Sequence, residues 1–218
     1  MAKSLRTLAL QLRRNHGVTW IPTFDAGIRP GSVLDFKRWN DVDHIGHLTD
    51  DPALAEQDLE VVGPVPCLLA DLRRTHEVRL SAALELLQPR PSAQADFQRA
   101  KEVVVGFDSP VSYTTSLIRL ETVLEADPEL WQRPLGQWLK RRRTRVVFQV
   151  IRGRLSFLFR GSGAAGVDLQ AELANLDRIR LGDRWQWRNE ATLESKHEVV
   201  LAVETARYRF KHRRFLTV

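Results

Sequence analysis

The residues best suited to chemistry form a short cluster of histidines and aspartates. His44 and His47 are three positions apart, and four aspartates lie close to them in the chain: Asp41, Asp43, Asp50 and Asp51. Imidazole nitrogens and carboxylate oxygens are good ligands for divalent metals, but a metal site needs further ligands at a defined spacing. The pair has no such third ligand. A solvated polar loop is therefore the favoured interpretation, and a metalloenzyme is the minor alternative.

A second motif has the spacing of a dinucleotide-binding loop. Gly161, Gly163 and Gly166 match the pattern G-x-G-x-x-G, which can hold a pyrophosphate at the start of a helix. The preceding segment carries Arg152 and Arg154, whereas strands of a parallel sheet covered on both faces are almost continuously apolar. We therefore interpret the glycines as a connector between two strands.

No other catalytic signature is found. The sequence has no serine nucleophile elbow, metalloprotease helix or phosphate-binding P-loop motif. We therefore expect a protein that is not an enzyme, with no catalytic residue, cofactor or metal. The only cysteine, Cys67, cannot form an intrachain disulfide. It predicts a reducing, cytoplasmic compartment and a buried, weakly polar side chain.

Composition narrows the class of protein further. The 218 residues are 43% hydrophobic, enough for one substantial core, so we expect a single domain over residues 1–218. No apolar run reaches the length of about 18 residues that a transmembrane helix needs. The net charge of +6 favours a polyanionic partner, either nucleic acid or an anionic membrane surface. Much of this charge lies in one block: Lys140, Arg141, Arg142 and Arg143.

The elements that must position these residues include long alternating segments. Residues 145–160 and 167–188 alternate between apolar and polar types, and the small-residue segment 161–166 joins them. Residues 77–86 and 97–107 repeat this construction around a proline-rich break. Successive strand side chains point to opposite faces, so each segment predicts a strand with one apolar and one charged face. Such strands suit a soluble sheet or a membrane hairpin, and residues 168–182 could also be helical.

The remaining elements follow from periodicity and from turn residues. An amphipathic helix is predicted over residues 5–14, with Arg13 and Arg14 opposite its apolar side and Gly17 after its end. Asp127, Pro128 and Glu129 predict the start of a second helix, which Pro134 divides. Further segments are predicted as strands at 18–21 (stopped by Pro22), 33–36, 111–123 and 199–210, as a polar connection at 44–51, and as a loop or edge at 61–66.

Taken in order, these segments resemble the pore-forming domain of gasdermins, most closely the bacterial ones. The resemblance is carried first by the helix that ends at His16-Gly17, then by 18–22, by Gly27-Ile28-Arg29-Pro30 with Val33-Leu34, and by Ile45-Gly46-His47-Leu48. Later, Val105-Gly106-Phe107-Asp108 is similar to the end of the family's first membrane hairpin. Residues 146–151, before Arg154-Leu155-Ser156, are similar to the start of the second.

The resemblance implies an α+β fold, with a twisted, mostly antiparallel central sheet flanked by helices. It implies that two hairpins, roughly residues 76–110 and 144–188, can become membrane β-strands. The side chains expected to enter lipid are Val78, Leu80, Ala82, Leu84, Val103, Val105, Phe107, Val147, Phe157, Val167, Leu169, Ala171 and Leu173. The side chains expected to meet lipid headgroups are Arg13, Arg14, Lys140, Arg141, Arg142 and Arg143.

The function implied is a pore-forming effector of cell death in anti-phage defence, cytoplasmic when inactive and located in the inner membrane when active. Its partners would be anionic lipids and further copies of itself, with no nucleic acid. The chain has no cysteine near its N-terminus and no segment after the last strand that would form an inhibitory domain or tail. We therefore expect a separate protein or an oligomerisation cue to control it. The alternative is a basic, non-enzymatic module that binds nucleic acid or an acidic protein.

Overall fold

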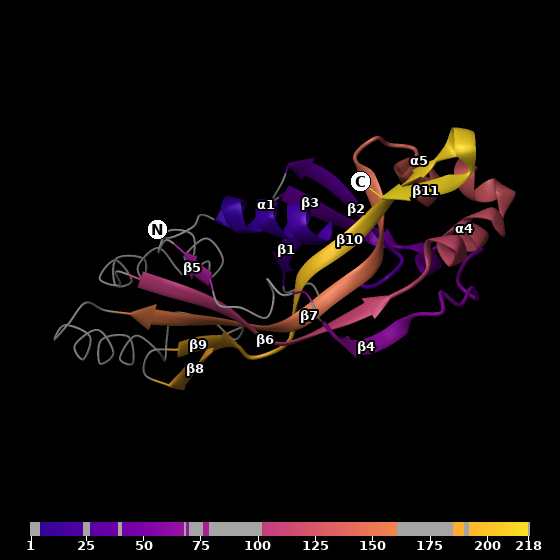
Figure 1. The fold of residues 1–218 in the computed structure, drawn as a ribbon. Helices are drawn as coiled ribbons and strands as arrows, with labels where there is room; N and C mark the ends of the chain where they lie inside the picture. Colours follow the sequence, from indigo (N-terminus) through magenta and orange to yellow (C-terminus); the bar gives the residue numbers. More distant parts are fainter. Residues whose placement is uncertain are drawn as a thin grey trace. The chain divides into compact units, whose positions relative to one another are not determined.

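The computed structural model divides the chain into two compact units (Figure 1). The first unit contains Met1–His16, Cys67–Pro110 and Gly153–Val199, and the second contains Gly17–Pro66, Val111–Arg152 and Val200–Val218. The structure describes residues 5–23, 27–38, 41–67, 69, 76–78, 102–160, 185–189 and 192–217. Each strand pair of known register is antiparallel, and the predicted α+β fold is confirmed.

Among its described residues, the first unit combines one helix with parts of two long strands. Its elements are α1 (Leu5–His16), β5 (His76–Val78), the first part of β6 (Glu102–Thr114), the second part of β7 (Thr144–Arg160), β8 (Trp185–Asn189) and β9 (Thr192–Ser195). β5 pairs with β6, and β9 lies between β7 and β8. Both β6 and β7 continue along the chain into the second unit.

The second unit is built on a sheet in which β7 is a central strand. Along the path β1-β10-β7-β2-β3, the new strands are β1 (Thr19–Thr23), β2 (Ser32–Arg38), β3 (Asp41–His47) and β10 (Val199–Arg209). β11 (Arg214–Thr217) pairs with β10, and β4 (Val62–Pro66) pairs with β6. The helical elements are η1 (Leu48–Asp50), α4 (Leu117–Glu125), η3 (Pro128–Gln132), α5 (Pro134–Leu139) and η4 (Phe210–His212).

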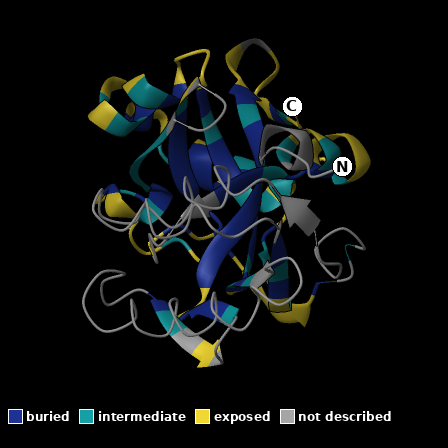
Figure 2. Ribbon diagram, turned by 90° about the vertical axis from the view of Figure 1, so that its left-hand side faces the viewer, coloured by how far each residue is buried: buried dark blue, intermediate teal, exposed yellow. Residues whose placement is uncertain are grey.

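Both faces of this sheet are buried. Val33 and Val146 belong to one hydrophobic cluster, whereas their neighbours Leu34 and Val147 belong to another. Because consecutive strand residues point to opposite faces, apolar side chains cover the sheet on each side. Figure 2 shows buried residues along the long strands and exposed ones on helices and turns.

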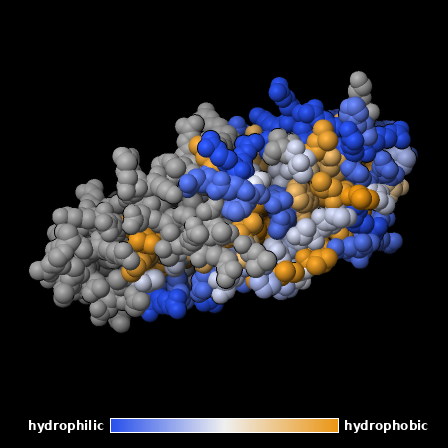
Figure 3. Space-filling model, in the orientation of Figure 1, coloured by the Kyte–Doolittle hydropathy of each residue, from blue (hydrophilic) through white to orange (hydrophobic). Residues whose placement is uncertain are grey.

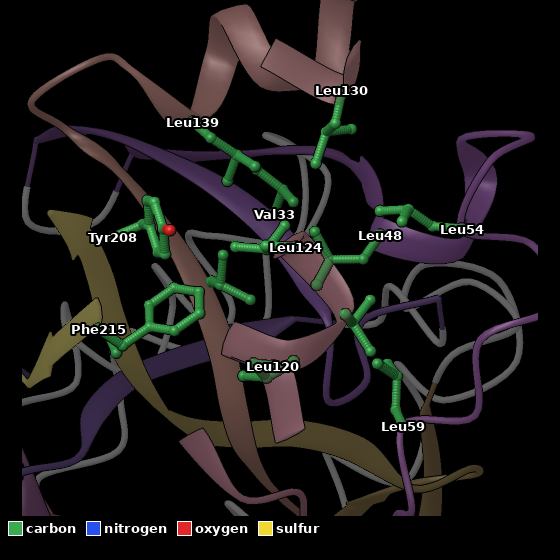
Figure 4. Packing of buried hydrophobic residues seen from close by; sticks show 13 residues of the cluster. Val33, Leu48, Leu54, Leu59, Leu120, Leu124, Leu130, Leu139, Tyr208 and Phe215 are labelled. Atoms are coloured by element: carbon green, nitrogen blue, oxygen red, sulfur yellow. The ribbon is translucent and has the colours of Figure 1, made fainter. Parts of the chain in front are cut away.

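Helix α4 supplies much of the first of these clusters. Its side chains Leu120, Val123 and Leu124 are fully buried, and their spacing of three and four residues places them on one helix face. They lie among strand and loop residues in Figure 4, including Leu48, Leu54, Val33, Tyr208 and Phe215. Each such side chain contributes about 1.5–3 kcal/mol when it is fully removed from water.

Three predicted elements differ from the structure. Residues 44–51 are not a polar connection but the end of β3 followed by η1. Residues 117–123 are helical rather than extended, because Ser116 caps the helix by accepting a hydrogen bond from the Arg119 N–H at 3.0 Å. Pro22 does not stop β1, which continues to Thr23. Its register against β10 shifts between Trp20 and Thr23, and such an irregularity tolerates a missing N–H donor.

Other expectations are confirmed. α1 ends at His16, and Gly17 follows with a φ of 72°. Asp127 caps η3 and Pro134 begins a separate α5, so the predicted helix is divided. β10 matches the predicted strand at 199–210, and β4 is an exposed strand that pairs with β6. None of the helices in the described ranges is long and apolar enough to cross a membrane.

Candidate membrane-interacting strands and basic surface

The apolar face of β6 is buried in this structure. Val103 and Val105 are fully buried and Phe107 is nearly so. Val103 and Val105 stand opposite Val78 and His76 of β5 in the antiparallel ladder. The three side chains predicted to enter lipid are therefore shielded from water here, and any transfer to a membrane must first detach them.

The first-unit part of β7 has the regular alternation that the sequence predicts. Gly153, Leu155 and Phe157 are buried, whereas the residues between them are more accessible. Phe157 is fully buried, and its ring meets that of Trp185 edge-on at a centroid distance of 5.5 Å. One face of this strand is therefore apolar and covered, and the other is polar.

The described end of the second predicted hairpin, residues 185–188, does not pair directly with β7. β7 pairs with β9 through Phe157 and Leu193, and β8 pairs with the other side of β9. Trp185 is buried as its parity predicts. Within the described residues, β8 is thus one strand away from β7 rather than beside it.

The remaining predicted membrane residues divide into two groups. Val147 is fully buried in the second hydrophobic cluster of the second unit. Val78 belongs to β5. The three glycines of the dinucleotide-like motif lie outside the described ranges. So do the other predicted membrane residues: Leu80, Ala82, Leu84, Val167, Leu169, Ala171 and Leu173.

Arg13 and Arg14 lie in the last turn of α1 and are exposed. Leu12, next to Arg13 in the sequence, is fully buried, so the helix has the predicted apolar and basic sides. Cations near a helix C-terminus are stabilised by the helix dipole. Arg13 and Arg14 therefore have a structural reason for their position as well as being accessible to an anion.

The basic block between α5 and β7 is exposed, but most of its side chains have intramolecular partners. Lys140 Nζ donates a hydrogen bond to the Trp131 carbonyl at 2.8 Å. The Arg141 guanidinium lies 3.6 Å from the centroid of the Trp138 ring, a cation–π contact.

Arg143 has the strongest structural role in this block. Its Nε lies 2.9 Å from Oδ1 of Asp35, whose side chain is 1% exposed. A buried carboxylate is costly unless a cation or hydrogen-bond donors compensate it. Arg142 is exposed and makes no ion pair with any residue in the described ranges. Of the four cations, Arg142 is therefore the one best placed to bind an external anion.

His47, which the sequence offered as a metal ligand, has a structural role. Its Nδ1 accepts a hydrogen bond from the Thr49 N–H at 3.2 Å, so Nε2 carries the proton that it donates to the Pro30 carbonyl at 2.7 Å. Burial, the largest cause, lowers the pKa of His47 below its usual value of 6.5. Both ring nitrogens are engaged in holding the start of η1 against the turn before β2.

The acidic neighbours of His47 also have partners within the fold. Asp50 accepts a hydrogen bond from the His47 N–H at 2.6 Å, and Asp51 pairs with Arg133 at 2.7 Å. These contacts, together with the desolvated ring, make the segment a rigid corner. Among the described residues, no group of three or more histidine, cysteine, aspartate or glutamate side chains is arranged to hold a metal.

Cys67 is buried and not disulfide-bonded, as predicted. Its N–H donates a hydrogen bond to the Pro110 carbonyl at 2.8 Å. This bond fixes the backbone after β4 to the strand β6.

The structure also forms a second basic surface, on the hairpin of β10 and β11. On the β10–β11 hairpin, Ala206, Tyr208 and Phe215 face the core, and their alternation places Arg207, Arg209 and Arg214 on the other face. Reading residues 206–216 as two paired strands would have found this arrangement, but the short turn between them carries no strong sequence signal.

The comparisons with known proteins agree with the fold predicted from the resemblance. No protein-family model matches the chain, and no curated protein matches its sequence. Among solved structures, it is similar to a bacterial gasdermin from Bradyrhizobium tropiciagri, with a TM-score of 0.55 and 13% identity. The match covers 97% of this chain and 90% of that protein. The chain therefore has a bacterial-gasdermin-like fold over nearly its whole length.

Proposed function

We propose that this protein is a pore-forming effector whose two hairpin regions, about residues 76–110 and 144–188, extend into the inner membrane as β-strands. Its assembly there as a ring would kill the cell that produces it, in defence against phage. The observation that carries the proposal is the likeness of nearly the whole chain to a bacterial gasdermin. It is supported by the two-faced strand β7, whose first-unit part is apolar on one side only.

The lengths of the strands are compatible with this proposal. A tilted membrane strand needs about 9–11 residues, while β6 has 13 and β7 has 17. In the resting protein, Val105 and Phe157 are packed against protein. In the pore, lipid would replace these protein contacts, so the apolar side chains would stay out of water in both states.

The backbone places a further requirement on the transition. An unpaired N–H or C=O group in hydrocarbon costs several kcal/mol, and a single inserted hairpin has two unpaired edges. Only a closed ring pairs every edge. Insertion and oligomerisation should therefore be coupled, and a separate protein or an oligomerisation cue could hold the resting state by blocking either step.

Anionic lipid is the proposed partner of the basic residues. Each cation close to an anionic bilayer contributes about 1 kcal/mol. Arg13, Arg14 and Arg142 are exposed, and none of them has an ion pair with the described residues. Of the six cations predicted to meet lipid headgroups, they are the most able to bring the resting protein from the cytoplasm to the inner membrane.

Dye release from liposomes tests the proposal. The purified full chain should release dye from vesicles rich in phosphatidylglycerol and not from vesicles of phosphatidylcholine alone. Leu169→Asp should reduce the release rate about tenfold, because a charge on the lipid face costs on the order of 1–2 kcal/mol in every subunit. The matched control is Gln170→Asp, on the opposite parity, which should retain release.

Two outcomes would count against pore formation. The first is equal release by Leu169→Asp and by the unchanged chain. The second is salt-sensitive binding to DNA or RNA together with no release under any lipid composition, which is the behaviour of a nucleic-acid-binding module.

A further inference from the structure

The second unit carries two exposed surfaces of opposite chemistry. The first, which we call the arginine–aromatic surface, consists of Phe210 and four cations: Arg207, Arg209, Arg213 and Arg214. The second, which we call the acidic–apolar strip, consists of Asp58, Glu60, Val61, Val62 and Val65. Neither surface belongs to the hairpin regions or to the basic block considered above.

The cations of the arginine–aromatic surface are crowded together. Arg209 and Arg214 stand directly opposite each other in the β10–β11 ladder, and like charges in such positions repel. Burial and the nearby charges of Arg209 and Arg142 lower the pKa of Arg207. None of these arginines forms an ion pair within the described part of the chain. Crowded like charges that form no ion pair with the described residues indicate a surface that an external anion can stabilise.

An aromatic pocket adjoins these cations. Trp131 and Tyr208 stack with ring centroids 5.2 Å apart, and Phe210 meets Trp131 edge-on at 4.6 Å. These rings, with Leu124 and Pro128, line an open pocket of about 490 Å³ to which Glu125 and Arg213 add charge. Phe210 remains 37% exposed. The expected occupant therefore offers apolar side chains as well as negative charge.

The acidic–apolar strip has this composition. Val61, Val62 and Val65 are 45%, 65% and 46% exposed, and Figure 3 shows a hydrophobic patch at the position of β4. Asp58 and Glu60 immediately precede the valines and are also exposed. Pro64 and Pro66 lack N–H donors, so this edge is poorly suited to adding another strand. It would dock through its side chains.

The two surfaces lie at opposite ends of α4. Near its start, Arg119 donates a hydrogen bond to the Asp58 carbonyl at 2.7 Å, while Leu124 and Glu125 at its end line the pocket. The helix has nine residues and is therefore about 13 Å long. In Figure 1, β4 and β11 lie on opposite sides of it. One molecule can therefore present both surfaces to different neighbours.

We propose that the acidic–apolar strip of one molecule docks on the arginine–aromatic surface of a second copy. A symmetric contact would place arginine against arginine or glutamate against glutamate, so the favourable contact is head to tail. Head-to-tail contacts repeated around an axis produce rings. The inference rests on the proposed function in that a pore requires a repeated contact between neighbours, but the contact itself can be tested independently of pore formation.

The strength of this contact should depend on where it forms. The strip is short, and stable interfaces bury about 800 Å² on each partner. We therefore expect weak association in solution. Confinement to a membrane surface raises the effective concentration of the copies, so the contact should become populated there.

Site-specific disulfide formation between two differently tagged chains tests the geometry. Both chains carry Cys67→Ser, one carries Val62→Cys and the other Phe210→Cys. Mixed on phosphatidylglycerol vesicles under mild oxidation, they should form the mixed dimer about tenfold more than either self-dimer, because only a head-to-tail contact brings these positions together. Lys37→Cys replaces Phe210→Cys as the control, since it is exposed on β2 and outside both surfaces.

Charge reversal separates docking on protein from docking on lipid. Arg209→Glu should lower the mixed-dimer yield about tenfold, and Glu60→Lys in the other chain should restore it. Arg209 is exposed and has no ion pair with the described residues, so circular dichroism and the melting temperature of Arg209→Glu should be unchanged. Glu60→Lys also breaks the ion pair of Glu60 with Arg119 at 3.4 Å, which costs less than about 1 kcal/mol at an exposed site, so the fold should be retained. If Arg209→Glu weakens vesicle binding but leaves the mixed-dimer yield per bound molecule unchanged, the surface binds lipid and the proposal is wrong.

The same samples distinguish the two proposals. Dye release without preferential cross-linking would contradict this contact and leave the pore function standing. Preferential cross-linking without dye release would support the contact and contradict the pore. Equal yields of mixed dimer with Phe210→Cys and with Lys37→Cys would also overturn the contact.

Discussion

The two halves of strand β7 have different surroundings, although they belong to one uninterrupted strand. In its second-unit half, Val146 and Val147 are both fully buried, and they contribute to different hydrophobic clusters. In its first-unit half, every second residue is buried, among them Leu155 and Phe157. The second-unit half is covered on both faces, and the first-unit half is covered on one.

This difference shows how one strand can combine an anchor with a movable arm. Removing a strand covered on both faces exposes about twice as much apolar surface as removing a strand covered on one face, and the cost is proportional to that area. Opening should therefore begin in the first-unit half of β7, and the second-unit half, which the proposed hairpin also includes, should leave its neighbours last.

The largest effect should come from the core of the anchoring unit. Leu124→Ala removes a fully buried side chain from the cluster under α4, and such changes cost about 2–5 kcal/mol. We expect the free energy of unfolding in urea to fall by this amount. Glu125→Ala, an exposed neighbour on the same helix, is the control and should change it by less than about 0.5 kcal/mol. Similar losses in both variants would mean that α4 does not anchor the sheet.

A second prediction concerns adjacent arginines of the basic block. Arg143→Ala leaves the buried carboxylate of Asp35 without its cation. Because Arg143 is itself half exposed and water can partly replace it, we expect a loss of about 1–3 kcal/mol in the free energy of unfolding. Arg142→Ala should leave stability unchanged and instead weaken binding to phosphatidylglycerol vesicles. A loss of stability in Arg142→Ala together with none in Arg143→Ala would mean that Arg143 does not compensate the buried charge of Asp35.

Much of the fold could be predicted from the sequence, for identifiable reasons. The strict alternation of residues 151–158 and the Asp127-Pro128 cap depend on neighbours in the chain, and both are confirmed. Residues 117–123 were predicted as a strand because their apolar residues suit either period, and only the Ser116 cap and burial against Phe215 favour the helix. Local pattern cannot resolve a choice that tertiary packing makes.

The candidate site shows the same limit. The cations Lys140 to Arg143 were predicted as one lipid-binding group because they are consecutive. Their partners, such as Asp35 for Arg143, are distant in sequence and could not be inferred from it. His47 is similar, since the Pro30 carbonyl that fixes its ring precedes it by 17 positions. The predicted membrane residues of both hairpins remain predictions.

A third prediction compares the two halves of β7 directly. Amide hydrogen exchange reports the free energy of the opening that exposes each N–H group. We expect amides of residues 153–158 to exchange at least about tenfold faster than those of 146–151, which corresponds to about 1.4 kcal/mol less protection. The experiment uses the full chain in solution, with exchange followed by mass spectrometry. Uniform protection along β7 would remove the distinction between anchor and arm.

The smallest effect should be the response of the anchoring unit to acid. Burial lowers the pKa of His47 below 6.5 in the folded state, so the unfolded chain binds the extra proton at higher pH than the folded one does. The stability due to the neutral ring is therefore complete above pH 6.5, and it declines as the pH falls toward the folded-state pKa. His47→Gln should be less stable at pH 7.5 and should lose less stability on acidification to pH 5.5 than the unchanged chain. Equal declines, measured by urea unfolding at both pH values, would show that His47 does not couple proton binding to the fold, and the corner between β3 and η1 would have to be held by the Asp50 and Arg133 contacts instead.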